Sequence, residues 1–153
     1  MEADLKKLYT YAVALLARRD YHSVALREKL ENKGIGGEVE VETILQKFKD
    51  KNFINDERYV SRYIIEQLAR KPQSIRLVKQ RLLQKNIRGT EVDQELNKHL
   101  NGELERAQTA ARKKTALLQN LSPIARKEKL FRFLCARGFT SGTIIEALNL
   151  INS

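Results

Sequence analysis

The sequence predicts an all-α protein, an elongated tandem array of three three-helix repeats with about nine helices. Three observations support this fold class. Apolar residues recur at helical spacing, the alternation typical of strands is scarce, and one helix-ending phrase occurs three times at a constant spacing of 52 residues. The copies of this phrase begin at Leu30, Leu82 and Leu134.

Each copy has the residue order expected at the C-terminus of a helix. A leucine is followed three residues later by a base, then by Gly or Asn, then by a large hydrophobe. The base suits the negative end of the helix dipole, and Gly or Asn supplies a left-handed residue. The left-handed positions are Gly34, Asn86 and Gly138.

The helices of the first repeat follow from apolar spacing. Apolar residues between positions 5 and 16 predict a first helix. A second starts at His22 or Ser23 and closes at Gly34, and Gly36-Gly37 opens a third.

The second repeat shows clear starts and stops. Asn55-Asp56 caps a helix that Pro72 breaks, and Ser74 starts the next one. Thr90 with Asp93 resembles a capping box for a short acidic helix.

The third repeat begins with a helix from about Glu103 to Leu118. We expect this helix to direct Ala107, Ala110, Ala111 and Leu117 inward. Ser122-Pro123 starts a further helix, and the last helix carries Ile144, Ile145 and Leu148. The predicted repeats span residues 1–53, 54–101 and 102–153.

The net charge of +10 is unevenly distributed. Residues 56–88 hold nine bases against three acids, and residues 106–137 hold nine bases against one acid. Between them, residues 89–105 hold five acids and one base. Two basic blocks separated by an acidic one indicate a surface that faces a polyanion, with nucleic acid as the leading candidate. The alternative is a set of solvated helix faces that contact nothing.

The helix predicted after Ser74 carries the clearest candidate surface. Arg81, Lys85 and Arg88 follow i, i+4, i+7 spacing and form one row beside the apolar stripe. Such a row can meet successive phosphates with salt-sensitive, largely sequence-independent affinity, so charge reversal along it is expected to weaken binding. The full set of candidate binding residues is Arg70, Lys71, Arg76, Lys79, Arg81, Lys85, Arg88, Arg126, Lys127 and Arg132.

Other chemistry has little support in the sequence. His22 and His99 are isolated, and Cys135, the only cysteine, is expected to be a buried thiol. The third helices of the repeats open with small or acidic residues, which disfavours the reading of base edges. We therefore expect no catalytic residue, no metal and no cofactor. The absence of a long apolar run and of a signal peptide predicts a cytoplasmic protein.

Three segments, residues 53–59, 26–30 and 132–139, together resemble the RecX family, bacterial regulators of the RecA recombinase. Phe53-Ile54-Asn55-Asp56-Glu57-Arg58-Tyr59 is similar to the family's (F/Y)-(I/L)-(D/N)-D-x-R-(F/Y) stretch. Leu26-Arg27-Glu28-Lys29-Leu30 looks like its E-L-x-x-K-L element without the acid, and residues 132–139 look like its R-F-L-x-x-R-G-(F/Y) signature. Ser74 stands where the family commonly has glycine, and Arg81 where it usually has an acid.

The resemblance implies a non-enzymatic modulator of DNA repair and recombination. Members of the family are elongated and all-helical, and they lie in the groove of the RecA filament on single-stranded DNA. They inhibit strand exchange, ATP hydrolysis and co-protease activity, in part by promoting filament disassembly. The expected partners here are the RecA filament and single-stranded DNA, with double-stranded DNA as an additional candidate, for a monomeric protein.

Two other hypotheses remain open on the sequence alone. A general nucleic-acid-binding repeat protein would bind DNA as strongly without a recombinase as with one. A protein–protein adaptor whose charge only aids solubility would show no salt-dependent DNA affinity.

Overall fold

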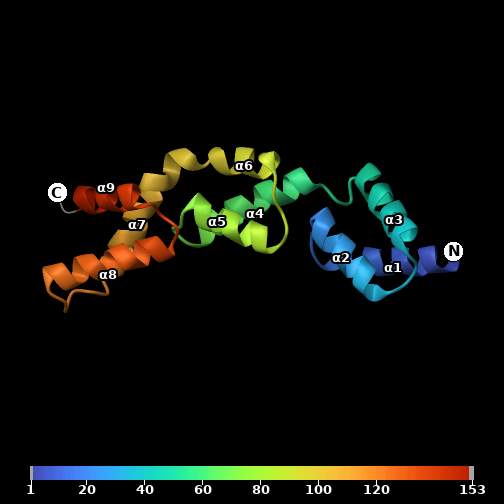
Figure 1. Ribbon diagram of the computed structural model, residues 1–153, viewed down its shortest axis with the longest axis horizontal. Coiled ribbons are helices and arrows are strands. Elements are labelled where there is room, and N and C mark those ends of the chain that lie inside the picture. The colour runs from blue at the N-terminus through green and yellow to red at the C-terminus, as the bar shows by residue number, and fades with distance from the viewer. Residues whose placement is uncertain (1, 152–153) are drawn as a thin grey trace. The chain divides into compact units, whose positions relative to one another are not determined.

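The computed structural model describes residues 2–151, and in this range the protein folds into nine α-helices and one short 3₁₀ helix (Figure 1). This confirms the predicted all-α fold class of three-helix repeats. The helices are α1 (Glu2–Arg18), α2 (Ser23–Lys33), α3 (Glu38–Asp50), α4 (Asp56–Arg70), α5 (Ile75–Gln84), α6 (Thr90–Asn97), the 3₁₀ helix η1 (Leu100–Gly102), α7 (Glu103–Thr115), α8 (Pro123–Ala136) and α9 (Ser141–Ile151). None of the helices in this range has the length and apolar character needed to span a membrane.

The chain forms two compact units, and the boundary between them falls within α4, between Arg62 and Tyr63. This division is a property of the packing and is distinct from the three predicted repeats. The repeat boundaries at residues 53/54 and 101/102 stay a prediction.

In the first unit, α1, α2 and α3 pack against one another as a three-helix bundle (blue to cyan in Figure 1). Each helix contributes apolar residues at helical spacing, so one face of each is buried. The completely buried side chains include Leu8 of α1, Leu26 and Leu30 of α2, and Ile44 and Phe48 of α3.

In the second unit, α5 packs against α6, and α7 packs against α8 and α9. Ala107, Ala110 and Ala111 form the buried face of α7, and these small side chains allow α9 to approach closely. Ile144 and Leu148 of α9 are buried in the same core. The helices α7 to α9 therefore form a second three-helix group (orange to red in Figure 1).

The left-handed residue of the repeated helix-ending phrase is confirmed in all three copies. Gly34, Asn86 and Gly138 have positive φ angles of 75°, 61° and 90°. The leucine that begins each phrase is fully buried. In the second and third copies, the N–H of the following hydrophobe, Ile87 or Phe139, bonds back to the carbonyl of that leucine, which is the Schellman arrangement.

A carboxylate joins the start of α4 to the start of α2. Asp56, the first residue of α4, accepts hydrogen bonds from the backbone N–H and the hydroxyl of Ser23. His22 caps α2 through Nδ1, which accepts from the N–H of Val24 at 3.1 Å, and its Nε2 lies 3.6 Å from Asp56 Oδ2. The negative charge therefore lies at the positive end of the α2 dipole, where it is stabilising. We call this contact the first latch.

An equivalent contact joins α7 to α5 within the second unit, and we call it the second latch. Glu103, the first residue of α7, accepts from the hydroxyl of Ser74 at 2.6 Å and from the N–H of Ile75 at 3.1 Å. Arg106 donates to Glu103 at 2.9 Å and to the carbonyls of Gln73 and His99. The first residue of a later helix thus binds the N-terminus of an earlier one in both units.

Close approach of α8 to the same place depends on Gly138. The N–H of Ser74 donates to the carbonyl of Arg137 at 2.9 Å, and Arg137 Nη1 donates to the carbonyl of Pro72 at 3.0 Å. A Cβ atom on Gly138 would lie 2.9 Å from Leu77 Cβ and 3.1 Å from the Leu77 backbone nitrogen. Glycine is therefore required at position 138 for two reasons: its φ angle is positive, and a side chain would collide with Leu77.

Two local predictions were wrong. The helix α7 ends at Thr115, earlier than predicted, so Leu117 is 76% exposed and Leu118 is buried in its place. Thr90 and Asp93 form no capping box, since Gly89 is the N-cap and makes no side-chain bond.

Candidate nucleic-acid interface

The helix α5 is fixed at its start by Ser74 and along its length by apolar packing. The Ser74 hydroxyl accepts from the N–H of Arg76 at 3.1 Å, and Val78 and Leu82 are fully buried. From α5, Arg81 reaches the last turn of α4, where it bonds to the side chain of Gln67. The two helices are joined by residues 71–74, where Pro72 interrupts the helical hydrogen bonding.

A hollow of about 280 Å³ lies between the end of α4, the connection and α5. We call it the basic hollow, because three of its six lining residues are cations and none is an acid. Its lining residues are Tyr63, Gln67, Arg70, Lys71, Gln73 and Arg81. Of the predicted binding residues, the structure brings Arg70, Lys71 and Arg81 together here.

Arg81 is held in place by two side-chain amides. Its Nη1 donates to Gln73 Oε1 at 2.5 Å and to Gln67 Oε1 at 3.2 Å. Gln73 is 1% exposed, and its Nε2 donates to the Gln67 carbonyl at 2.6 Å, so its position is fixed in turn. The guanidinium of Arg81 is therefore half-buried and pre-oriented, and its Nη2 and Nε form no hydrogen bond to residues 2–151.

The three cations of the hollow, Arg70, Lys71 and Arg81, are not paired with carboxylates in the part of the chain that the structure describes. Clustered cations without an anion attract one from solution, and guanidinium groups bond strongly to phosphate and carboxylate oxygens. The hollow therefore has the electrostatics of an anion site.

An aromatic ring forms part of the wall beside these cations. Tyr63 lines the hollow, and the Nζ of Lys85 lies 5.7 Å from the centroid of its ring. The predicted binding residue Lys85 is thus next to the basic hollow, through Tyr63.

The predicted row of Arg81, Lys85 and Arg88 does not exist as a helical row. The helix α5 ends at Gln84, and Asn86 adopts the left-handed conformation, so Arg88 lies in the segment before α6. Because the phrase that ends the helix starts at Leu82, the i+7 position falls beyond the helix. Arg88 is exposed and stays a candidate on its own.

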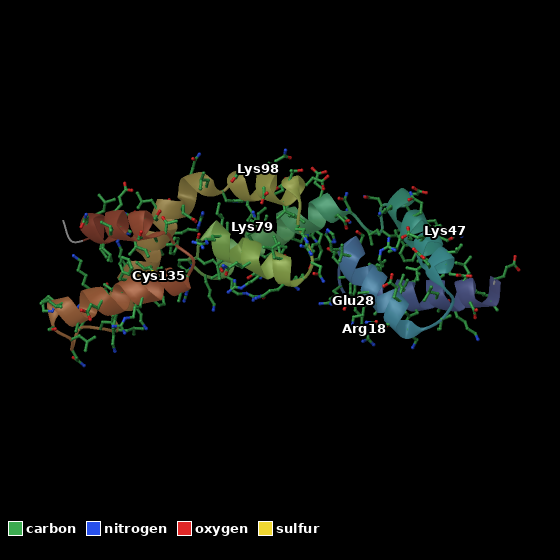
Figure 2. The ribbon with its side chains drawn as sticks, viewed as in Figure 1. Arg18, Glu28, Lys47, Lys79, Lys98 and Cys135 are labelled. Atoms are coloured by element: carbon green, nitrogen blue, oxygen red, sulfur yellow. The ribbon has the colours of Figure 1, made fainter. Side chains whose placement is uncertain are left out.

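Arg76 and Lys79 lie on α5 outside the hollow lining. Arg76 is exposed, while Lys79 (labelled in Figure 2) forms a partly exposed ion pair with Asp93 of α6 at 2.7 Å. An anion that binds Lys79 must compete with Asp93. Lys79 is therefore expected to contribute less to the affinity for an anion than Arg76 does.

The predicted residues of α8 are separate from the basic hollow. Arg126 donates to the carbonyls of Leu118, Gln119 and Leu121, and so it closes the turn after α7. Lys127 is exposed, and Arg132 lies 3.8 Å from Glu128 with both side chains largely exposed. Arg126 has a structural task, and Lys127 and Arg132 are surface cations.

Sequence reasoning missed Gln67 and Gln73 as parts of the site, and the i, i+4 spacing of Tyr59 and Tyr63 favoured packing between helices over stacking on bases for Tyr63, which lines the hollow. Two amides flanking a proline break, close to a run of cations, were the available signal. Cys135 was expected to be buried but is exposed on α8 (Figure 2), because it follows the buried Leu134 by one position and therefore lies on another face of the helix. In the described range, no group of three or more His, Cys, Asp or Glu side chains is placed to hold a metal ion.

Comparison with known proteins identifies relatives along almost the whole chain. A family model described as the third three-helix domain of RecX matches residues 101–148. Regulatory protein RecX of Chlorobaculum tepidum is 33% identical over 141 residues, which cover 92% of this chain and 86% of that protein. Regulatory protein RecX of Neisseria meningitidis strain FAM18 is 33% identical over 147 residues, covering 94% and 90%.

The fold is similar to that of a solved structure. The crystal structure of RecX from Lactobacillus salivarius matches with a TM-score of 0.89 at 21% identity, covering 99% of each chain. The structural match supports the all-helical repeat fold, and the sequence relatives establish the family. The chain belongs to the RecX family of regulatory proteins.

Proposed function

We propose that the protein is a non-enzymatic regulator that binds the RecA–single-stranded DNA filament and inhibits its recombinase, ATPase and co-protease activities. In this role it regulates DNA repair and recombination. Family membership supports a regulatory role. The observation that carries the DNA side of the proposal is the basic hollow, where three cations lie together without an ion-pair partner in residues 2–151.

The physical basis is the exchange of counterions for phosphates. A DNA strand in a filament is a dense line of negative charge, and each cation that neutralises a phosphate releases a bound counterion. The hollow and the exposed cations Arg76, Lys85 and Arg88 supply such groups, whereas residues 89–105 are acidic. We propose that the protein acts in the bacterial cytoplasm, where its proposed partners are found. We also propose that it acts as a monomer.

The test is a titration of the protein into a RecA ATPase assay on single-stranded DNA. A parallel titration measures binding of the protein to the same DNA without recombinase. The proposal expects hydrolysis to fall at protein concentrations that leave naked DNA largely unbound, because the filament is the preferred target. ATP hydrolysis that stays unchanged at saturating protein would overturn it.

The same pair of titrations tests the second candidate function, a general nucleic-acid-binding protein. The basic hollow favours this candidate too, because its chemistry requires only an anion. If inhibition follows the occupancy of naked DNA, the protein competes for DNA and the filament is not its specific target.

A further inference from the structure

The basic hollow combines the groups that a single nucleotide of a DNA strand requires. We propose that it holds one backbone phosphate of single-stranded DNA, with an adjoining base stacked on Tyr63. The inference deepens the proposed function and rests on it for the identity of the strand. The residues that line the hollow and supply its charge and hydrogen-bond donors all come from one copy of the chain.

Arg81 supplies the fixed part of the phosphate site. The two amide oxygens that hold its Nη1 leave Nη2 and Nε for a ligand. The amide nitrogen of Gln67 has no acceptor among the described residues, so it is a further donor in the lining. A phosphate oxygen meets a pre-oriented guanidinium here, and little side-chain freedom is lost on binding.

Arg70 and Lys71 supply the adaptable part. Both are exposed, both line the hollow, and neither forms an ion pair in residues 2–151. Their charges repel one another and that of Arg81 when the hollow is empty. A phosphodiester removes this repulsion and accepts several charge-assisted hydrogen bonds at once.

The volume of the hollow is compatible with such a group. A water molecule occupies about 30 Å³ in the liquid. A hollow of about 280 Å³ therefore admits a phosphate together with several waters, without displacement of protein atoms.

Tyr63 favours a single strand over other anions. Stacking on an aromatic ring requires a base with an open face. An unpaired base has one, whereas neighbouring base pairs cover both faces of a base inside a duplex. Carboxylates of an acidic protein segment would satisfy the cations but gain nothing from the ring. The Nζ of Lys85 lies over the ring, 5.7 Å from its centroid, so a base stacked on that face displaces it toward the next phosphate along the strand.

The first test measures binding of fluorescent oligo(dT) to the full chain, without recombinase, as a function of salt. The variant R70Q/K71Q/R81Q removes the three charges of the hollow. The control K6Q/K7Q/K29Q removes three exposed charges from α1 and α2. A third variant, R70Q/K71Q, keeps the hydrogen bonds of Arg81 to Gln67 and Gln73. It therefore separates the loss of charge from any misfolding caused by the loss of Arg81.

Both hollow variants are expected to bind at least about tenfold more weakly. The salt slope is expected to fall by about 0.7 for each phosphate that the variant no longer neutralises. The control is expected to keep most of the wild-type affinity and slope. Equal weakening of the control and the hollow variants would overturn the site. Wild-type protein that fails to bind oligo(dT) at low salt would overturn it as well.

The second test concerns Tyr63. The variant Y63F keeps the ring and Y63L removes it, and each is titrated with single-stranded and double-stranded DNA. Y63L is expected to lose about tenfold in affinity for the single strand and little for the duplex, while Y63F keeps the preference. An unchanged preference in Y63L would overturn the stacking. An acidic peptide that binds as tightly as oligo(dT) and competes with it would assign the hollow to a protein partner instead.

These results are separable from the fate of the proposed function. If oligo(dT) binding depends on the hollow but RecA ATPase activity is not inhibited, the nucleotide site stands and the proposed function fails. If ATPase activity is inhibited but the hollow variants bind oligo(dT) as tightly as the wild type, the nucleotide site fails and the proposed function stands.

Discussion

Replacement of Glu103 by alanine is expected to destabilise the second unit strongly, because one carboxylate accepts three hydrogen bonds there. Its donors are the buried hydroxyl of Ser74, the N–H of Ile75 and the guanidinium of Arg106. The side chains of Glu103 and Arg106 are only 18% and 17% exposed, so water replaces these interactions poorly.

The expected loss is about 3 kcal/mol in the free energy of unfolding. A hydrogen bond to a charged group contributes about 1.5–3 kcal/mol, but the Ser74 hydroxyl can turn to other acceptors and the N–H of Ile75 can meet water. Breaking a largely buried ion pair costs about 3–5 kcal/mol, and Arg106 keeps its bonds to two carbonyls, which lowers this figure.

The measurement is urea unfolding followed by circular dichroism, with E105A as the matched control. Glu105 lies in the same first turn of α7 and is exposed, so E105A removes the same charge near the helix dipole. It is expected to cost less than about 0.5 kcal/mol. Equal costs for E103A and E105A would refute the second latch. D56A against E57A makes the same comparison for the first latch.

Two further predictions concern backbone geometry and pH. G34A is expected to cost about 1–2 kcal/mol for its left-handed backbone alone, since its Cβ meets nothing within 4 Å. G138A is expected to cost about 1–3 kcal/mol more in urea unfolding, because its Cβ meets Leu77, and equal costs would contradict this reasoning. A hydrogen bond from Arg27 lowers the pKa of Glu42 below its ordinary value of 4.5, so its stabilisation is present above pH 4.5 and is lost as the pH falls through the lowered folded-state pKa. E42Q is therefore expected to flatten the dependence of stability on pH below about pH 4.5, and an unchanged acid-side slope would count against the pair.

The helices and their ends could be predicted because their causes are local. The phrase at Leu30, Leu82 and Leu134 sets a left-handed residue and a returning hydrophobe within six residues, and the structure confirms both features in the second and third copies. In the first copy the left-handed Gly34 is confirmed, and Ile35 is only half-buried. Errors arose where a helix ended early, as at Thr115 and Gln84.

The site could be predicted only in part because its contacts are not local. Periodicity marked Arg70, Lys71 and Arg81 as surface cations, but not their convergence on one hollow. That convergence depends on the turn at Pro72 and on the hydrogen bonds from Arg81 to the side-chain amides of Gln73 and Gln67, which lie 8 and 14 residues away in the sequence. The latches span 29 and 33 residues, so no single helix pattern contains them.

The departures from the family resemblance are informative in this respect. Ser74, where glycine is common, uses its hydroxyl to bind Glu103. Arg81, where an acid is usual, is the fixed cation of the basic hollow. Residues that looked like exceptions in the sequence thus make specific contacts in the structure.

The most direct test of the account compares inhibition of RecA ATPase by the wild-type protein, by R70Q/K71Q/R81Q and by K6Q/K7Q/K29Q. We expect the hollow variant to need at least about tenfold more protein for half-inhibition, because a protein that neutralises fewer phosphates binds the filament more weakly. The control variant is expected to inhibit like the wild type. Equal inhibition by all three folded proteins would contradict the claim that the basic hollow engages the filament.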